Sequence, residues 1–145
     1  MKEKLLISAC LCGKNTKYNG KHNLINRLSE LEEKYELYLV CPEVEGGLTV
    51  PRVPSEIVGD KVLSKDLVDV TSKFCIGATY ALNIVLKNNI KKALLKEGSP
   101  SCGVNQIYDG TFSGNKISGS GITTRLLKEN GVLVYSENDI DELLK

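Results

Sequence analysis

The sequence predicts a single α/β domain, residues 1–145, with a Rossmann-like open sheet of about four mainly parallel strands. Short apolar runs alternate along the chain with segments of helical periodicity, which is typical of βαβ units. The 145 residues, 41% of them hydrophobic, suffice for one domain with a real core, and they contain no repeat or linker. Because crossovers between parallel strands are right-handed, we expect helices on both faces. The expected strand order is 2-1-3-4, with the switch point between the first and third strands.

Two strands and one helix are expected in the first third of the chain. Residues 5–7 are a short apolar run, as in a buried strand, and residues 11–22 are a polar loop. Asn23 is a suitable N-cap for a helix with apolar residues at helical spacing, namely Leu24, Ile25, Leu28 and Leu31. The second strand, residues 37–40, ends immediately before Cys41.

A long loop is expected at residues 42–65, which hold three of the four prolines. A loop of that length inside a domain is usually functional, and its Val, Leu and Ile content favours an ordered structure. A helix then starts at Asp69 or Thr71 and runs to about Asn88. Its expected inner face consists of Phe74, Ala78, Ala81, Leu82 and Val85.

The remaining expected elements are a strand at 90–95, a small inserted hairpin at 107–112, a helix at 122–130 and a strand at 132–135. Asp109 and Gly110 suit a type I′ turn in the hairpin. Gly131 is expected to end the helix, and Asn138 is a suitable cap for a last short helix.

Charge and composition exclude several classes of function. The chain has 19 Lys and Arg against 18 Asp and Glu, whereas a broad nucleic-acid or membrane-surface interface needs clustered positive charge. No apolar run approaches the ~20 residues that span a bilayer, and the N-terminus has the pattern of a strand, not of a signal peptide. We therefore expect a cytoplasmic protein that acts on a small molecule, with no nucleic-acid or membrane partner; the sequence does not indicate its oligomeric state.

Three of the five cysteines follow predicted strands. The odd number and wide spacing of the five, at positions 10, 12, 41, 75 and 102, argue against a disulfide scaffold. Cys10, Cys41 and Cys102 each lie beyond the carboxyl end of a strand, and in an open parallel sheet ligands bind at this edge. Gathered thiolates repel one another unless a cation neutralises them, so the trio indicates zinc or an iron–sulfur cluster. The alternative is that each cysteine only packs as a small apolar side chain.

The other two cysteines have separate interpretations. Cys75 lies beside Phe74 in the predicted helix and is expected to be a core thiol. Cys12 is either a fourth ligand or a loop residue. A redox pair formed by Cys10 and Cys12 is disfavoured, because the usual pair is separated by two residues and not by one.

Several short motifs form a pattern: SACLCG at 8–13, CPE at 41–43 with GGL at 46–48 and PR at 51–52, SPSCG at 99–103, IYDGTF at 107–112 and GSGI at 119–122. In this order and spacing they resemble the thiouracil desulfidase family over nearly the whole chain. The CPE…GGL…PR and SPSCG blocks are the most specific part of the resemblance.

The resemblance implies a [4Fe–4S] cluster held by three cysteines, with the fourth iron free of protein ligands. By motif, the ligands are Cys10, Cys41 and Cys102. The implied activity is non-redox removal of sulfur from a thiolated uracil, 4-thiouracil or 4-thiouridine monophosphate, with release of hydrosulfide, in the salvage of tRNA-derived nucleotides. The family usually has an apolar residue where Cys12 stands, which leaves open whether Cys12 closes the fourth iron.

Water that adds to carbon 4 of the pyrimidine needs a general base. Glu43 is the expected base, because it follows a ligand cysteine by two residues, and Glu45 is the second choice. Ser99 and Ser101 precede the third ligand cysteine, and either hydroxyl could hold the water or stabilise developing charge. The alternatives are a surface carboxylate and turn-forming serines.

Substrate-binding candidates are the helix start at Gly119, Ser120, Gly121 and Thr123, together with Arg52 and Tyr18. A helix start offers free backbone N–H groups and the positive end of a helix dipole to a phosphate. Arg52 could pair with a phosphate or with Glu43, and Tyr18 could stack on the base. Ordinary turn and surface roles are the alternatives.

A second hypothesis is a non-catalytic metal- or iron–sulfur-binding module, such as a sulfur carrier or sensor, with Cys12 as the fourth ligand. A cluster closed by four protein ligands has no open position for a substrate. The placement of Cys12 relative to the trio therefore discriminates between the two hypotheses.

Overall fold

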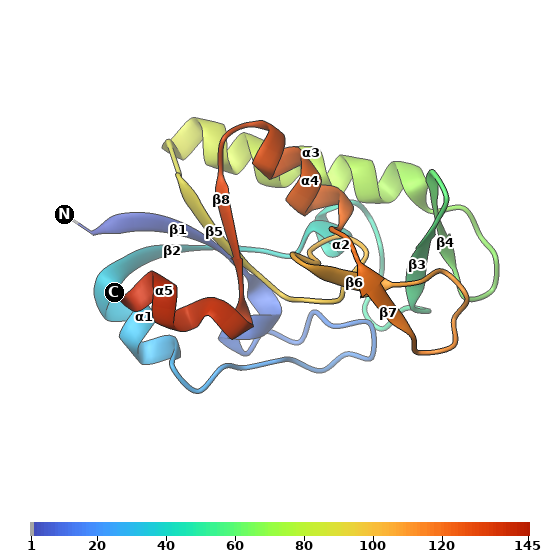
Figure 1. Ribbon diagram of the computed structural model, residues 1–145, viewed down its shortest axis with the longest axis horizontal. Helices are drawn as coiled ribbons and strands as arrows, with labels where there is room; N and C mark the ends of the chain where they lie inside the picture. Colours follow the sequence, from blue (N-terminus) through green and yellow to red (C-terminus); the bar gives the residue numbers. More distant parts are fainter. Residues whose placement is uncertain (1) are drawn as a thin grey trace.

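A four-stranded parallel sheet forms the centre of the molecule (Figure 1). The computed structural model describes residues 2–145. The strands are β1 (Glu3–Ser8), β2 (Tyr35–Val40), β5 (Lys92–Leu95) and β8 (Leu133–Ser136). Their spatial order, β2-β1-β5-β8, and parallel pairing confirm the predicted order 2-1-3-4. The chain changes direction across the sheet between β1 and β5, so the expected switch point lies at their carboxyl ends.

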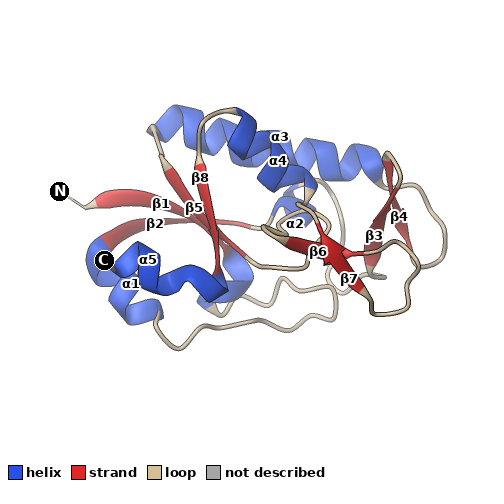
Figure 2. Cartoon of the chain, viewed as in Figure 1, coloured by secondary structure: helices blue, strands red, loops and turns tan. Residues whose placement is uncertain are grey.

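Helices cover both faces of this sheet, as predicted (Figure 2). On one face lie α3 (Thr71–Asn88) and α4 (Ile122–Glu129), and on the other lie α1 (Leu28–Lys34) and α5 (Ile140–Leu144). Side chains alternate along β1, so Leu6 packs on the face that α3 and α4 cover, while Leu5 and Ile7 pack on the face that α1 and α5 cover. Because the sheet is buried on both faces, each of its central strands contains a continuous apolar run, residues 5–7 in β1 and 93–95 in β5.

The long helix α3 presents the expected face to the core. Its buried residues are Phe74, Gly77, Ala78, Ala81 and Val85, and Leu82 is partly buried. Cys75 is exposed, so the expectation of a core thiol is wrong; it lies ~100° around the helix from Phe74 and outside the buried stripe. Within residues 2–145, no helix has the length and apolar character needed to cross a membrane.

Helix α1 begins at Leu28 and not at Asn23. The backbone N–H of Asn23 donates to the carbonyl oxygen of Cys10 at 2.9 Å, and that of Ile25 donates to Leu11 at 3.1 Å. These bonds hold the segment in an extended course along the 3₁₀ turn Ala9–Cys12. The Asn23 side chain, which suits a helix cap, instead donates to Cys10 Sγ.

Residues 42–65 contain regular structure that the prolines and glycines obscure. Helix α2 (Pro42–Glu45) follows β2 directly, and β3 (Ser55–Val58) pairs with β4 (Lys61–Ser64) in an antiparallel hairpin. Gly59, at φ 64°, begins the two-residue turn of this hairpin, which is a position that favours glycine. The expectation of one long loop is wrong.

The second hairpin is wider than expected. Strands β6 (Gln106–Tyr108) and β7 (Lys116–Ser118) are joined by residues 109–115, not by a two-residue turn at Asp109 and Gly110. The loop is fixed from outside: the buried Glu56 carboxylate accepts hydrogen bonds from the N–H groups of Gly110 and Phe112 at 2.9 and 3.2 Å. This tertiary anchor replaces the local turn.

Ser136, and not Asn138, caps the C-terminal helical segment. Its hydroxyl accepts a hydrogen bond from the N–H of Asn138 at 3.1 Å, and the Asp139 carboxylate accepts from the N–H of Ser136 at 3.1 Å. This reciprocal pair is a capping box at the 3₁₀ turn Glu137–Asp139 that leads into α5.

Candidate functional site

A cavity of about 380 Å³ opens at the carboxyl ends of β1, β2 and β5. Cys10, Cys41 and Cys102 all line it, although each follows a different strand. The strand order explains this arrangement, because β2, β1 and β5 are neighbours and end at the same edge of the sheet. The structure thus brings together the three cysteines that were selected for their position after strands.

Each cysteine is held by a different local structure. Cys10 lies in the 3₁₀ turn after β1, and Asn23 Nδ2 donates to its Sγ at 3.4 Å. Cys41 immediately precedes α2, and its Sγ lies 3.8 Å from the carbonyl oxygen of Thr16. Cys102 is buried in the loop after β5, and its N–H donates to Ser99 Oγ at 3.0 Å.

Burial raises the pKa of all three thiols. Loss of hydration raises the pKa of Cys102 well above its usual value, and the negative charges of Glu43 and Cys41 raise it further. Loss of hydration also raises the pKa of Cys10 and of Cys41, although the hydrogen bond from Asn23 partly offsets the rise for Cys10. Without a cation the thiols are therefore protonated, and a metal would have to displace their protons.

The donor set fits an iron–sulfur cluster. Three cysteine sulfurs share one cavity, and thiolates are the usual ligands of such clusters. Within residues 2–145 no three His, Cys, Asp or Glu side chains are arranged to hold one metal ion. Each thiolate of a cluster binds a different iron, so the sulfurs stand farther apart than ligands of a single ion do.

A carboxylate and a hydroxyl face each other beside the cysteines. Ser99 Oγ donates to Glu43 Oε1 at 3.1 Å. Ser99 Oγ also accepts hydrogen bonds from the N–H groups of Ser101 and Cys102, both at 3.0 Å. Glu43 lies in the first turn of α2, where Pro42 occupies the first helical position. Both Glu43 and Ser99 line the cavity. The arrangement places a proton acceptor and a hydroxyl together at a site lined by sulfur.

Arg52 holds Glu43 from the opposite side. Its Nη2 lies 3.4 Å from Glu43 Oε2, and the two side chains are only 7% and 16% exposed. The same Nη2 donates to the carbonyl oxygen of Thr16 at 3.0 Å, and the Arg52 N–H donates to the carbonyl oxygen of Tyr18 at 2.7 Å. Tyr18 and Tyr108 line the cavity as well. Arg52 thus ties Glu43 to the loop that carries Tyr18.

The start of α4 contacts the loop that carries Cys102. The N–H groups of Ile122 and Thr123 already donate to the carbonyl oxygens of Pro100 and Ser101, both at 2.9 Å. Gly121 N–H donates to Gly103 at 2.8 Å. The residues that the expectation placed at a phosphate are absent from the cavity lining, namely Gly119, Ser120, Gly121 and Thr123. The helix start instead holds the loop that carries Cys102.

Two further candidates lie away from the cavity. Ser101 is fully buried, and its Oγ lies 2.7 Å from Thr123 Oγ1, so Ser99 is the serine that faces the site. Glu45 is exposed on α2 and does not line the cavity, unlike Glu43. Ser101 therefore differs from Ser99 in placement, and Glu45 differs from Glu43, although the sequence offers no clear distinction within either pair.

Cys12 lines a separate groove on the surface. Its neighbours there are Leu28, Glu32, Tyr35, Leu37 and Leu39, and it does not line the cavity of the other three cysteines. Burial, followed by the negative charge of Glu32, raises the pKa of Cys12 to about 11. The structure therefore does not bring Cys12 together with the trio.

Sequence reasoning missed several polar residues that line the cavity, namely Thr16, Asn23, Glu56, Lys96 and Glu97. Lys96 and Glu97 follow the apolar run of β5, so the rule that selected the cysteines could have found them. Glu56 lies in a hairpin that was expected to be a loop. Asn23 was interpreted only as a helix cap.

Three comparisons identify relatives of this chain. Residues 5–139 match the family model described as 2-thiouracil desulfurase. The uncharacterized protein YbbK of Bacillus subtilis (strain 168) is 39% identical, over 97% of this chain and 99% of its own length. The solved structure of the [4Fe-4S]-dependent thiouracil desulfidase TudS is 45% identical, with a TM-score of 0.94 over 98% of this chain and 95% of that one. On this evidence the chain belongs to the 2-thiouracil desulfurase family.

Proposed function

We propose that this protein removes sulfur from a thiolated uracil, with a [4Fe–4S] cluster held by Cys10, Cys41 and Cys102. The observation that carries the proposal is the convergence of the three thiols with Glu43 and Ser99 in one cavity. The cluster dependence of the structural relative TudS supports the same cofactor. When bound through three cysteines, the cluster supplies an iron that is open to the thiocarbonyl sulfur and acts as a Lewis acid.

The protein residues then act on water and on charge. Glu43 is placed to take a proton from a water that adds to the carbon bearing the sulfur, which is general base catalysis. Arg52 holds the Glu43 carboxylate in one orientation. Ser99, whose hydroxyl contacts Glu43, is placed to hold that water. Water supplies the new carbonyl oxygen and hydrosulfide leaves, so no electron donor is consumed.

The lining of the cavity suits a pyrimidine nucleotide. Tyr18 and Tyr108 offer aromatic faces for the base, and Lys17 and Arg52 supply positive charge. We propose 4-thiouracil or, with its phosphate near these cations, 4-thiouridine monophosphate as the substrate. Because the start of α4 is occupied by loop carbonyls, a phosphate would be bound by side chains and not by a helix end.

Anaerobic reconstitution with iron and sulfide tests the proposal. The protein should acquire an absorbance near 400 nm and then convert 4-thiouridine monophosphate, with one hydrosulfide released for each thiocarbonyl lost. The 2-thio and 4-thio bases, nucleosides and monophosphates, assayed in parallel, define the substrate. Protein without the cluster is the control. A reconstituted protein that releases no hydrosulfide from any of these compounds would contradict the proposal.

Replacing Cys12 with alanine should leave the cluster and turnover unchanged, because Cys12 lies in a separate groove. The measurements are iron and acid-labile sulfide per chain, and hydrosulfide release. The matched variant Cys41→Ala should lose the cluster. Loss of iron in Cys12→Ala would instead support a cluster closed by four cysteines, as a sulfur carrier or sensor would have.

A further inference from the structure

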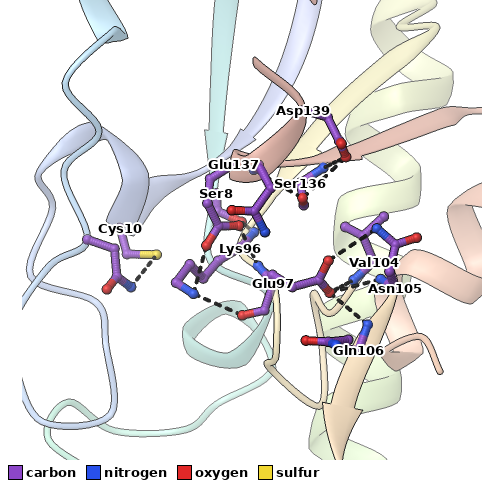
Figure 3. A network of polar contacts seen from close by, with 12 residues as sticks. Ser8, Cys10, Lys96, Glu97, Val104, Asn105, Gln106, Ser136, Glu137 and Asp139 are labelled. Atoms are coloured by element: carbon purple, nitrogen blue, oxygen red, sulfur yellow. Dashed lines mark hydrogen bonds and ion pairs between the residues drawn. The ribbon is translucent and has the colours of Figure 1, made fainter. Parts of the chain in front are cut away.

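A lysine that the proposed reaction does not use lies beside the three cysteines. Lys96 is the first residue after β5, and it lines the same cavity. Its Nζ lies 2.8 Å from Glu137 Oε2 and donates to the carbonyl oxygen of Glu97 at 3.0 Å. The Lys96 side chain is 32% exposed and that of Glu137 is 19% exposed. Figure 3 shows the Lys96 side chain joined to Glu137 and Glu97, with Cys10 to the left of them.

The surrounding strand ends fix this ion pair. Lys96 N–H donates to Ser8 Oγ at 3.0 Å, which ties the lysine to the end of β1. Glu137 follows β8, and its Oε1 accepts from the N–H of Glu97 at 2.8 Å. Both members of the pair are therefore held by backbone groups, as Figure 3 shows. Their positions relative to the sheet edge are set by the fold and not by a flexible surface contact.

The same network continues to the loop that carries Cys102. Glu97 Oε1 accepts hydrogen bonds from three consecutive backbone N–H groups at 2.6, 2.8 and 3.0 Å, those of Val104, Asn105 and Gln106. These groups lie two to four residues after Cys102 in the sequence. Lys96, Glu97 and Glu137 thus belong to one polar structure that borders the cysteine trio.

The positive charge of Lys96 lies in the cavity that the trio lines, at the end of the strand that pairs with β1, which precedes Cys10. Two other cations line the cavity: Arg52 already faces the Glu43 carboxylate, and Lys17 lies in the loop beside Tyr18. Bound thiolates and Glu43 are all negative. Because Lys96 is partly buried, solvent screens its positive charge weakly, and this charge reaches them.

We propose that Lys96 sets the electrostatic potential at the cluster bound by the cysteine trio, and that Glu137 limits and orients this positive charge. The inference rests on the proposed function only for the presence of the cluster. The reduction potential of an iron–sulfur cluster depends on nearby charge. A lysine that neutralises negative charge also favours binding of anionic sulfur at an open iron.

Two charge-removing variants should act in opposite directions. Lys96→Gln should shift the reduction potential of the cluster to a more negative value, because a reduced cluster loses a stabilising cation. It should also weaken the binding of added hydrosulfide, on the order of tenfold for one nearby charge. Glu137→Gln should shift the potential to a more positive value and strengthen hydrosulfide binding. The double variant should lie close to the unaltered protein.

The readouts are an anaerobic redox titration followed by the electron paramagnetic resonance signal of the reduced cluster, and a hydrosulfide titration followed by absorbance. Lys92→Gln is the matched control, since Lys92 lies on the same strand but pairs with Glu3 at the opposite edge of the sheet, at 3.4 Å. It should shift neither value. Lys96→Arg, which keeps the charge, should retain the potential of the unaltered protein.

The outcomes separate this inference from the proposed function. Shifts of the same sign in Lys96→Gln and Glu137→Gln, or no shift in either, would overturn the inference while leaving desulfidation intact. If Lys96→Gln does not retain its cluster, Glu137→Gln and Lys96→Arg still carry the sign test. Opposite shifts in a protein that releases no hydrosulfide from substrate would support the inference and contradict the proposed function. Absence of any cluster would overturn both.

Discussion

Replacing Glu43 with glutamine is expected to lower turnover by about 10²- to 10⁴-fold, the usual contribution of a general base. Glutamine has nearly the same shape and can still accept the hydrogen bond from Ser99, but it cannot take a proton from water. The cluster should be retained, because the charge of Glu43 raises the pKa of Cys102 and its removal makes thiolate formation easier. Single-turnover rates, with iron and sulfide content per chain, check both expectations.

The neighbouring carboxylate offers a matched control for this experiment. Glu45 is exposed, lies two residues further along α2 and does not line the cavity. Glu45→Gln should therefore keep turnover within about twofold of the unaltered protein. If Glu45→Gln proves the more damaging of the two changes, the assignment of the base to Glu43 is wrong.

Replacing Gly77 with alanine is expected to destabilise the fold by about 3 kcal/mol or more, at the upper end of overpacking effects. A Cβ at Gly77 would lie 1.8 Å from the carbonyl oxygen of Pro42, which is backbone and cannot move aside as a side chain can. Gly46 makes the reciprocal close approach, at 1.9 Å from the carbonyl oxygen of Lys73. Helices α2 and α3 therefore meet backbone to backbone through two glycines.

Urea unfolding measures this loss of stability. For a chain of this size, 3 kcal/mol corresponds to a fall in melting temperature of roughly 10 °C. Because Pro42 separates Cys41 from Glu43, the variant that does fold should also hold less iron. Thr79→Ala, at an exposed position of α3, should unfold almost as the unaltered protein does. Equal midpoints for Gly77→Ala and Thr79→Ala would show that α2 can shift without cost.

The sheet and the cysteine trio were predictable because both follow from simple periodicity. The central strands are buried on both faces, so residues 5–7 and 93–95 appear as unbroken apolar runs. Short apolar runs and helical segments in alternation fix parallel pairing, and parallel pairing brings strand ends together. Cys10, Cys41 and Cys102 needed no further information to be placed at one edge.

Several expectations differ from the structure where tertiary contacts replace local signals. Asn23 has the chemistry of a helix cap but donates to Cys10 Sγ, and Gly110 has the chemistry of a turn but donates to Glu56. The start of α4 has the chemistry of an anion site, yet Pro100 and Ser101 occupy its N–H groups. In each case the partner is remote in sequence, so no local pattern can reveal it.

The choice between similar neighbours was also beyond the sequence. Ser99 and Ser101 flank one proline, and Glu43 and Glu45 share one short helix. Which member faces the cavity depends on the backbone path of the loop and on the rotation of α2. That rotation is set by the contact between Pro42 and Gly77, which joins residues far apart in the chain.

The three thiols follow three different strands, and this wide spacing in the sequence has a consequence for folding. A cluster bound by residues 10, 41 and 102 would be a cross-link that closes two long stretches of polypeptide, and long loops restrict an unfolded chain most strongly when they are closed. The cofactor would thus be gained and lost together with tertiary order. Oxidative damage to the cluster would then remove the cross-link between the three strand ends. The chain without its cluster would be degraded more easily than the chain that holds it.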